Sequence, residues 1–350
     1  IPASVVLLLY AMLFGEKVNG AGRWVAGFQP SEVAKGVLIV CAALILSICF
    51  DKERGKVTKQ GFKLCLGMAA VICALILPEN LSTAVLTFGV VLMIMFVGRA
   101  DWRWLAAIVA AIVLSGGLFF TFLKAAPMST IQTVSEIPGL HRLPTWANRV
   151  RAASAADDDP ATLDINKNQQ VVHANIAVST SNIIGKGPGN SVERDYLPQA
   201  YADFIFAIIV EELGLVGGAA VVLLYIALLF RAGVIASRCE RRFPALLCMG
   251  LALLIVVQAM INICVCVGML PVTGQQLPLV SRGGTGMILN CVYIGMILSV
   301  SRYADKAPKL AAAPFANADN VDILDNLDNV DNLDNLDNFE TTSISNEDNN

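Results

Sequence analysis

Long apolar runs separated by short polar segments make up most of the chain. A helix needs about 20 apolar residues to cross the bilayer core, which is about 30 Å thick. The pattern predicts membrane-spanning helices at eight runs: 1–14, 30–50, 64–78, 81–98, 104–123, 203–230, 245–268 and 284–301. Because Pro78-Glu79-Asn80 separates the third run from the fourth, we expect these two helices to meet at a membrane face. The fold class is therefore an all-α polytopic membrane protein.

Composition excludes a water-soluble globule. Of the 350 residues, 56% are hydrophobic and 15% are charged, and the mean hydropathy is +0.64. Soluble domains carry about 25% charged residues. The nine cysteines lie in or beside apolar runs and none has C-x-x-C spacing. A disulfide framework or a cysteine metal site is therefore not expected.

Polarity also divides the chain into a transmembrane domain, 1–305, and a tail, 306–350. The tail holds ten acidic and two basic residues, and it repeats Asp-Asn followed by one aliphatic residue. We expect a disordered, low-complexity cytoplasmic tail, with an acidic interaction segment as the alternative. The first apolar run lacks the basic start of a signal peptide, so we expect the natural N-terminus to lie upstream.

The distribution of Lys and Arg predicts the orientation in the membrane. Fourteen of them lie in loops 51–63, 99–103 and 231–243 and in the segment just after 301, whereas loops 15–29 and 269–283 hold three. Loops rich in Lys and Arg stay on the cytoplasmic side. This places the large polar, turn-rich loop 124–202 outside the membrane, where loops of such length are usually functional or disordered.

Ionisable residues gather at the outer ends of the predicted helices. Charges within a membrane are costly and by default mark function. Asp203 would stand at the outer mouth of helix 203–230. At about 100° per residue, Glu211 lies about 80° around this helix from Asp203 and Glu212 about 180°, so Glu211 is expected to face the same cavity. The complete set is Glu32, Lys35, Glu79, Asp203, Glu211, Glu212 and Arg282.

Structural explanations exist for several of these residues. Glu32 and Lys35 are three positions apart on a helix, where an ion pair competes with substrate contact. Asp203 directly precedes an apolar helix and could be its N-cap. Gln258 and Asn262 are four apart and suit hydrogen bonds between helices.

The histidines and a glycine motif also have both a structural and a functional interpretation. The histidines His141 and His173 lack metal-ligand spacing, which favours ordinary surface residues. Gly283-Gly284-Thr285-Gly286 opens a helix and could cradle a phosphate, or it could only permit close helix packing.

Several motifs together resemble the SEDS family (shape, elongation, division and sporulation) from about residue 20 to 303. The segments Val272-Thr273-Gly274 and Ser281-Arg282-Gly283-Gly284-Thr285 are more similar to the cell-division member than to the elongation member. The motifs that carry the resemblance are Gly22-Arg23-Trp24, Gln29-Pro30-Ser31-Glu32 with Lys35, Gly187-Pro188-Gly189-Asn190-Ser191, Leu197-Pro198-Gln199-Ala200-Tyr201-Ala202-Asp203, Glu211-Glu212-Leu213-Gly214 and Gly268-Met269-Leu270-Pro271.

The resemblance implies a SEDS-type helical bundle of about ten transmembrane helices with a large outer loop after the seventh, so about two helices would precede this chain. It implies a peptidoglycan glycosyltransferase that polymerises lipid II by inverting transfer. Asp203 matches the family's essential aspartate and would be the general base on the acceptor 4-hydroxyl, with a raised pKa in a partly desolvated cleft. Undecaprenyl diphosphate would leave.

The remaining site residues are implied as supporting groups. Lys35, Lys186, Arg194 and Arg282 would stabilise the diphosphate, with a divalent cation, Mg²⁺ or Mn²⁺, as the candidate cofactor. Glu32, Glu79, Glu211, Glu212, Ser281, Gly283 and Gly284 complete the substrate-binding set. The sequence departs from the family pattern at several positions: Glu79-Asn80 in the P-D-L-G-T turn, Gln199 for Glu, Ala202 for Thr, Arg282 for Tyr, and Glu193-Arg194 where a Lys is common.

The implied partners are lipid II, a class B penicillin-binding protein (a transpeptidase), other divisome proteins and the membrane; no nucleic acid is expected. The implied place is the bacterial inner membrane at the division septum. Two alternatives of other classes stay open: a lipid II flippase or other transporter, and a non-catalytic divisome scaffold that recruits the transpeptidase.

Overall fold

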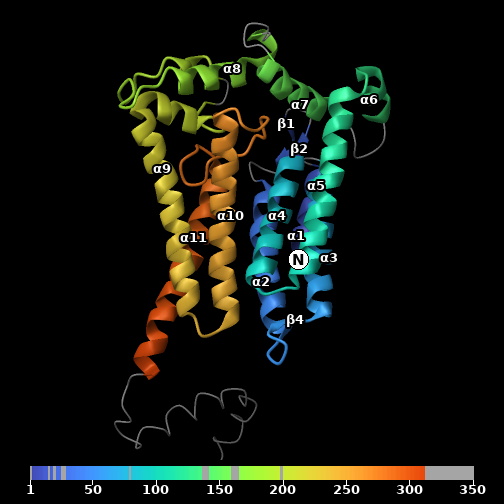
Figure 1. The fold of residues 1–350 in the computed structure, drawn as a ribbon, viewed down its shortest axis with the longest axis vertical. Coiled ribbons are helices and arrows are strands. Elements are labelled where there is room, and N and C mark those ends of the chain that lie inside the picture. The colour runs from blue at the N-terminus through green and yellow to red at the C-terminus, as the bar shows by residue number, and fades with distance from the viewer. Residues whose placement is uncertain are drawn as a thin grey trace, which may run out of the picture. The chain divides into compact units, whose positions relative to one another are not determined.

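The computed structural model of the chain describes residues 2–14, 16–18, 21–24, 29–78, 80–135, 142–158, 165–197 and 200–311. The chain splits into two compact units, Ile1–Ala304 and Asp305–Asn350. The tail beyond 311, including its expected disorder, lies outside the described residues. The structure described below is that of the first unit (Figure 1).

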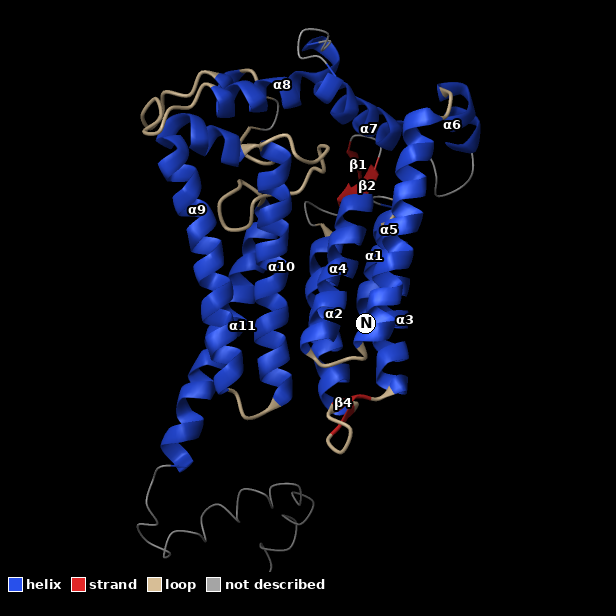
Figure 2. Cartoon of the chain, in the orientation of Figure 1, coloured by secondary structure: helices blue, strands red, loops and turns tan. Residues whose placement is uncertain are grey.

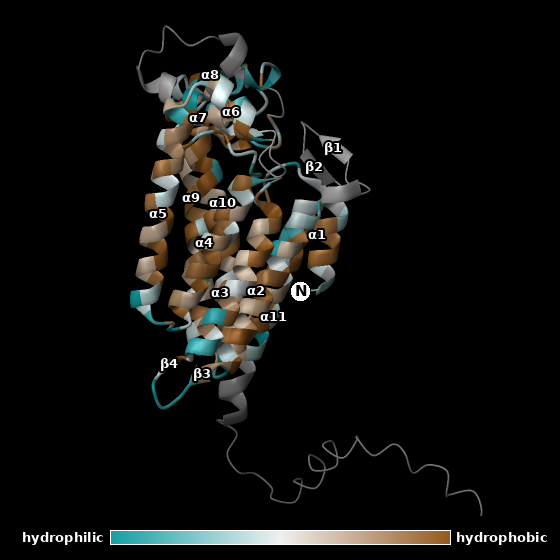
Figure 3. Cartoon of the chain, turned by 90° about the vertical axis from the view of Figure 1, so that its right-hand side faces the viewer, coloured by the Kyte–Doolittle hydropathy of each residue, from teal (hydrophilic) through white to brown (hydrophobic). Residues whose placement is uncertain are grey.

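Helices occupy all eight predicted apolar runs. They are α1 (Pro2–Phe14), α2 (Pro30–Ile48), α3 (Lys59–Ile76), α4 (Leu81–Val97), α5 (Trp102–Ala125), α9 (Ile205–Arg238), α10 (Arg242–Cys266) and α11 (Gly284–Ala311). Within the described part, six of them are long and apolar enough to cross a membrane, while α4 has 17 residues and α1 has 13. Their bodies are mostly apolar (Figure 3). The prediction of an all-α polytopic membrane protein is confirmed.

Local sequence signals set several helix boundaries. Pro30 opens α2 in the first turn, where its missing N–H costs no hydrogen bond. Thr58 caps α3 by accepting a hydrogen bond from Gly61 N at 3.2 Å, and Asn80 caps α4 in the same way from Thr83 N at 3.2 Å. Two short antiparallel hairpins, β1 (Glu16–Val18) with β2 (Ala21–Trp24) and β3 (Phe50–Asp51) with β4 (Lys56–Val57), complete the bundle (Figure 2).

Helix α10 forms the centre of the bundle and packs against α2, α4 and α9. Gly250 permits this close approach, since a Cβ there would lie 2.7 Å from Ile94 Cδ1 and 2.9 Å from Ile39 Cγ2. By contrast, α5 is mostly exposed, and only Leu105 and Leu123 are buried in it. Helix α5 therefore presents an apolar face that suits contact with lipid.

The large polar segment 124–202, predicted as the loop outside the membrane, connects α5 to α9, and its described residues include helices. It contains α6 (Met128–Ser135), α7 (Leu143–Asp158), α8 (Ile165–Ser179) and the 3-10 turn η2 (Glu193–Asp195). Helices α7 and α8 lie across one end of the bundle (Figure 1). Apolar residues at helical spacing, Leu143, Trp146, Ala147 and Val150, bury one face of α7. Because these apolar residues are few and the segment is polar, the sequence pattern did not indicate a buried helix face here.

Helix α9 also differs from the straight helix predicted over 203–230. It contains a break at Gly214, whose φ of 71° and ψ of −172° are not helical. The chain at 182–187 fits into the break: Lys186 N donates to Glu211 O at 3.0 Å and Leu215 N donates to Asn182 O at 3.2 Å. A Cβ on Gly214 would lie 2.3 Å from Ile183 O, so only glycine fits. The segment Ile205–Leu213 is thus separate from the long helix that follows.

Candidate functional site

Asp203 lies in the turn that leads into α9, outside the helix. The N-cap position is taken by Phe204, which makes no side-chain capping hydrogen bond. The N-cap explanation of Asp203 is therefore wrong, because the helix begins two residues later than the apolar pattern suggested. Asp203 Oδ2 lies 3.7 Å from the position that a Cβ on Gly274 would take. Gly274 has a φ of 69° and belongs to the segment that follows α10.

Three successive backbone carbonyls hold the Asp203 turn. Tyr201 O accepts from Arg282 N at 2.9 Å, Ala202 O accepts from Ser281 Oγ at 2.5 Å, and Asp203 O accepts from Asn262 Nδ2 at 2.8 Å. Two of the donors, Ser281 and Arg282, lie just before α11, and the third, Asn262, lies in α10. All three are far from the turn in sequence. The turn is therefore fixed from outside α9.

The segment 267–283 is itself anchored to the bundle at several points. Asn262 Nδ2 also donates to Gln275 O at 2.7 Å, and Gln258 Nε2 donates to Gln276 O at 3.1 Å. Gln275 Nε2 reaches Thr83 Oγ1 of α4 at 2.8 Å. The prediction of a hydrogen bond between helices is confirmed for Gln258, whose Oε1 accepts from Lys35 Nζ of α2. The groups that accept from Gln258 and Asn262 lie in the segment 267–283 and in the Asp203 turn. Sequence reasoning missed Gln275 and Thr83 altogether.

Lys35 and Glu32 form the ion pair that was weighed as the structural alternative. Lys35 Nζ lies 2.8 Å from Glu32 Oε1, and the lysine side chain is 1% exposed. The same Nζ donates to Gln258 Oε1 at 3.0 Å, and Tyr293 OH donates to Glu32 O at 2.9 Å. The ammonium is thus linked through Gln258 to the segment that carries Gly274.

The two adjacent glycines before α11 differ in what surrounds them. A Cβ on Gly283 would lie 1.8 Å from Gln276 Oε1, whereas a Cβ on Gly284 would meet nothing within 4 Å. Close packing, one of the two readings of this motif, therefore explains Gly283. Gly284 is the first residue of α11. The side chain of Arg282 is exposed next to it.

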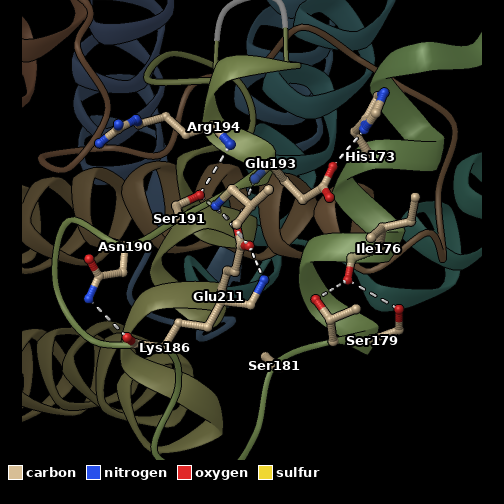
Figure 4. A network of polar contacts seen from close by, with 12 residues as sticks. His173, Ile176, Ser179, Ser181, Lys186, Asn190, Ser191, Glu193, Arg194 and Glu211 are labelled. Carbon is tan, nitrogen blue, oxygen red and sulfur yellow. Dashed lines mark hydrogen bonds and ion pairs between the residues drawn. The ribbon is translucent and has the colours of Figure 1, made fainter.

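Glu211 organises the segment 186–193 (Figure 4). Its carboxylate is 0% exposed and pairs with Lys186 Nζ at 2.6 Å. It also accepts from Ser191 Oγ at 2.5 Å, from Val192 N at 3.1 Å and from Glu193 N at 3.4 Å. The expectation that Glu211 faces the Asp203 cavity rested on one helix starting at 203, which the structure does not have. Lys186 is engaged in this pair.

Arg194 lies in η2 and is surrounded by polar groups. Arg194 Nε lies 3.2 Å from Asp195 Oδ1. The hydrogen bond to Asp195, together with the nearby Tyr201 and the charges of Asp195 and Glu212, raises the pKa of the Arg194 guanidinium. Arg194 stays charged. Glu212 is half-buried at the end of this group.

His173 is not the plain surface residue that the sequence suggested. Its Nδ1 lies 2.6 Å from Glu193 Oε2, and the two side chains are 16% and 12% exposed. The ring stacks on Tyr196 with centroids 5.4 Å apart. Its half-buried position depends on the contacts of α8 with Glu193 and Tyr196, which the local sequence does not show. Glu79 and His141 lie outside the described residues.

An apolar cavity of about 300 Å³ lies between the start of α4, α5, α7 and the loop after α10. Its walls include Phe119, Trp146 and Val272. Among the described residues, no group of three or more His, Cys, Asp or Glu side chains is arranged to hold a metal ion.

The geometry can be set beside known proteins. The model of the Cell cycle protein family, FTSW_RODA_SPOVE, matches residues 1–306. The chain is 34% identical over 318 residues to a probable peptidoglycan glycosyltransferase FtsW of Nitrosococcus halophilus, covering 87% of this chain and 74% of that one. It is also 32% identical over 307 residues to a probable peptidoglycan glycosyltransferase FtsW of Halomonas elongata, covering 85% of this chain and 71% of that one.

Two solved structures share the fold. One comes from work on the "structural coordination of polymerization and crosslinking by a peptidoglycan synthase complex". Its sequence is 26% identical, the alignment covers 87% of this chain and 80% of that chain, and the TM-score is 0.62. The other is the rod shape determining protein RodA of Thermus thermophilus, 24% identical, with 86% and 76% covered and a TM-score of 0.55. The second likeness concerns the fold alone.

Proposed function

The chain belongs to the Cell cycle protein family FTSW_RODA_SPOVE, and we propose that it is a peptidoglycan glycosyltransferase that polymerises lipid II with Asp203 as general base. Relatives at 32% and 34% identity carry the name of that enzyme. The division role comes from the same name, FtsW. The chain is a multi-pass membrane protein, with six helices of sufficient length and hydropathy in its described part.

The observation that supports Asp203 is the fixation of its turn. Three consecutive carbonyls, those of Tyr201, Ala202 and Asp203, each accept from a donor outside α9. A carboxylate on a backbone held in this way needs little reorganisation before proton transfer. Helix α9 begins at Ile205 with Phe204 in the N-cap position, so Asp203 lies in the fixed turn before the helix.

In the proposed reaction, the Asp203 carboxylate removes the proton of the acceptor hydroxyl. The oxygen then forms a bond to the anomeric carbon of the donor, while the bond to the diphosphate breaks and undecaprenyl diphosphate leaves with the electron pair. One displacement inverts the anomeric centre. General base catalysis of this kind contributes about 10²- to 10⁴-fold in rate.

The basic residues of the site differ in how readily they could bind the diphosphate. Lys35 is buried in its pair with Glu32 and Lys186 is paired with buried Glu211, so both already have carboxylate partners. The side chain of Arg282 is exposed, and its backbone is fixed to Tyr201. Arg282 is thus our first candidate for the diphosphate. Arg194 is the second, because its carboxylate partner Asp195 is 75% exposed and water solvates that pair. Mg²⁺ or Mn²⁺, if used, would be held by diphosphate oxygens together with Asp203.

The proposal places the site outside the cytoplasm, as the Lys and Arg distribution predicts. The apolar cavity beside Val272 has the chemistry to receive the first units of the lipid chain. A class B penicillin-binding protein and other divisome proteins are the proposed partners, and the division septum is the proposed place. The likeness to a peptidoglycan synthase complex supports a partner of this kind.

The test is a polymerisation assay. The purified chain is incubated with lipid II in detergent, with and without its cognate transpeptidase, and the glycan products are separated by length. Glycan strands from this chain are the expected result. If the chain binds the transpeptidase but yields no strands in either condition, the scaffold alternative is correct; if it moves lipid II across vesicle membranes without polymerising it, the flippase alternative is correct.

A further inference from the structure

A cavity of about 670 Å³ lies at the end of the bundle opposite α7 and α8, among the loops after α2, α4 and α9. Three basic residues from three different segments line it: Lys52, Arg99 and Arg242. One acidic residue, Glu240, lines it too. Counting one charge for each, the wall carries a net charge of +2. This is the end of the bundle where the charge pattern predicts the cytoplasm.

Arg242 is held in position within this cavity. Its guanidinium carbon lies 3.0 Å from the centroid of the Phe50 ring, and its Nη2 donates to Gly98 O at 3.4 Å. Stacking on an aromatic ring fixes the guanidinium plane and leaves its N–H groups at the edge free to bind an anion. The arrangement reduces the entropy lost when a ligand binds.

Arg99 stands in a backbone conformation that favours glycine. Its φ is 62°, in the left-handed region. The position is fixed by hydrogen bonds from Arg99 N to Phe96 O at 3.0 Å and from Val57 N to Arg99 O at 3.3 Å. An arginine in place of glycine brings strain without a packing benefit, because the side chain is exposed. Such strain points to a functional side chain.

The adjacent carboxylate does not neutralise Arg99. Asp101 lies two positions further on, and its Oδ1 is 2.7 Å from Lys56 Nζ. The hydrogen bond and charge of Lys56 hold the pKa of Asp101 below its usual value, so this pair persists. A second cavity of about 400 Å³ contains that pair. Arg103 also lines the second cavity, so its wall carries a net charge of +1, compared with +2 for the first.

We propose that the 670 Å³ cavity binds the headgroup phosphate of an anionic phospholipid, such as cardiolipin or phosphatidylglycerol. The basic residues meet the phosphate, and the apolar walls, including Val97 and Leu246, continue onto exposed apolar faces at Phe96 and Ile48, which are 66% and 71% exposed. A soluble anion would gain nothing from those faces. Basic pockets between helices on the cytoplasmic side are the known form of such sites.

The test is native mass spectrometry of the full chain in detergent with added tetraoleoyl cardiolipin. We expect one retained cardiolipin, weakened about fivefold for each basic residue removed. The variants are Arg99→Gly and Arg242→Gln, and the control is Lys63→Gln, which removes an exposed charge of α3 outside the cavity. Arg99→Gly should keep the thermal stability of the parent because glycine suits the local φ.

Three results would overturn the proposal. One is equal retention of cardiolipin by the parent and Arg99→Gly, and another is equal retention of phosphatidylcholine. The third is displacement of the lipid by millimolar inorganic phosphate, which would show a site for free anions.

Discussion

Replacing Glu211 with glutamine should loosen the segment 186–193 while leaving the helices intact. The carboxylate has two donors on each oxygen: Lys186 Nζ and Val192 N on Oε1, and Ser191 Oγ and Glu193 N on Oε2. Glutamine is the same size but presents one oxygen and one NH₂ group. Whichever way the amide turns, its NH₂ group faces at least one N–H donor that it cannot satisfy: Lys186 Nζ and Val192 N on one side, or Glu193 N on the other.

The magnitude follows from burial. Removing one partner of a buried ion pair costs about 3–5 kcal/mol. The Glu211 side chain is 0% exposed, but Lys186 is 32% exposed and water can solvate part of its charge. We therefore expect a cost of about 2–3 kcal/mol. If this cost falls on local opening, amide exchange in the segment becomes about 30- to 150-fold faster.

Hydrogen–deuterium exchange measured by mass spectrometry on peptides from 182–197 tests this prediction. Glu212→Gln is the matched control, because the adjacent side chain is half-buried and lies outside the Glu211 hydrogen-bond network. Polymerisation should fall more in Glu211→Gln than in the control, since the loosened segment leads into the Asp203 turn. Equal exchange in the two variants would refute the assignment of Glu211 as the organiser of this segment.

Three other predictions concern the turn, the glycines and the orientation. Gly283→Ala should destabilise the protein in detergent by about 1–3 kcal/mol, because the facing glutamine must move, while Gly284→Ala should change thermal stability by less than about 0.5 kcal/mol. Ser281→Ala should cost about 1–3 kcal/mol and slow polymerisation, because it leaves a half-buried carbonyl and a buried N–H without their hydroxyl partner; retention of the parental rate would refute this. In a cysteine-free background, a cysteine at Ser154 should react with an impermeant maleimide in spheroplasts and one at Ser343 should not, and the reverse would contradict the predicted orientation.

The apolar runs were enough to predict the helices because a bilayer demands length and hydropathy, whatever the partners. The Glu32–Lys35 pair could also be predicted, since i,i+3 spacing brings the two side chains together. The break in α9 could not, because it depends on the 182–187 segment that fits against Gly214.

The contacts that hold the Asp203 turn show the same limit. Asn262 could be recognised as polar in an apolar helix, but its acceptor on Asp203 lies 59 positions away. Sequence spacing does not encode such a pairing without the fold. For the same reason, Ser281 could be named from a family motif, but its hydrogen bond to Ala202 O could not be foreseen.

The rate of lipid II polymerisation by Asp203→Asn tests the central claim most directly. The hydrogen bonds that hold the turn use backbone oxygens, so the variant should match the parent in abundance, in thermal stability in detergent and in binding of its transpeptidase. Asparagine cannot accept the proton of the acceptor hydroxyl, so the polymerisation rate should fall by about 10²-fold or more. A variant that is stable and polymerises lipid II at nearly the parental rate would contradict the assignment of Asp203 as the general base.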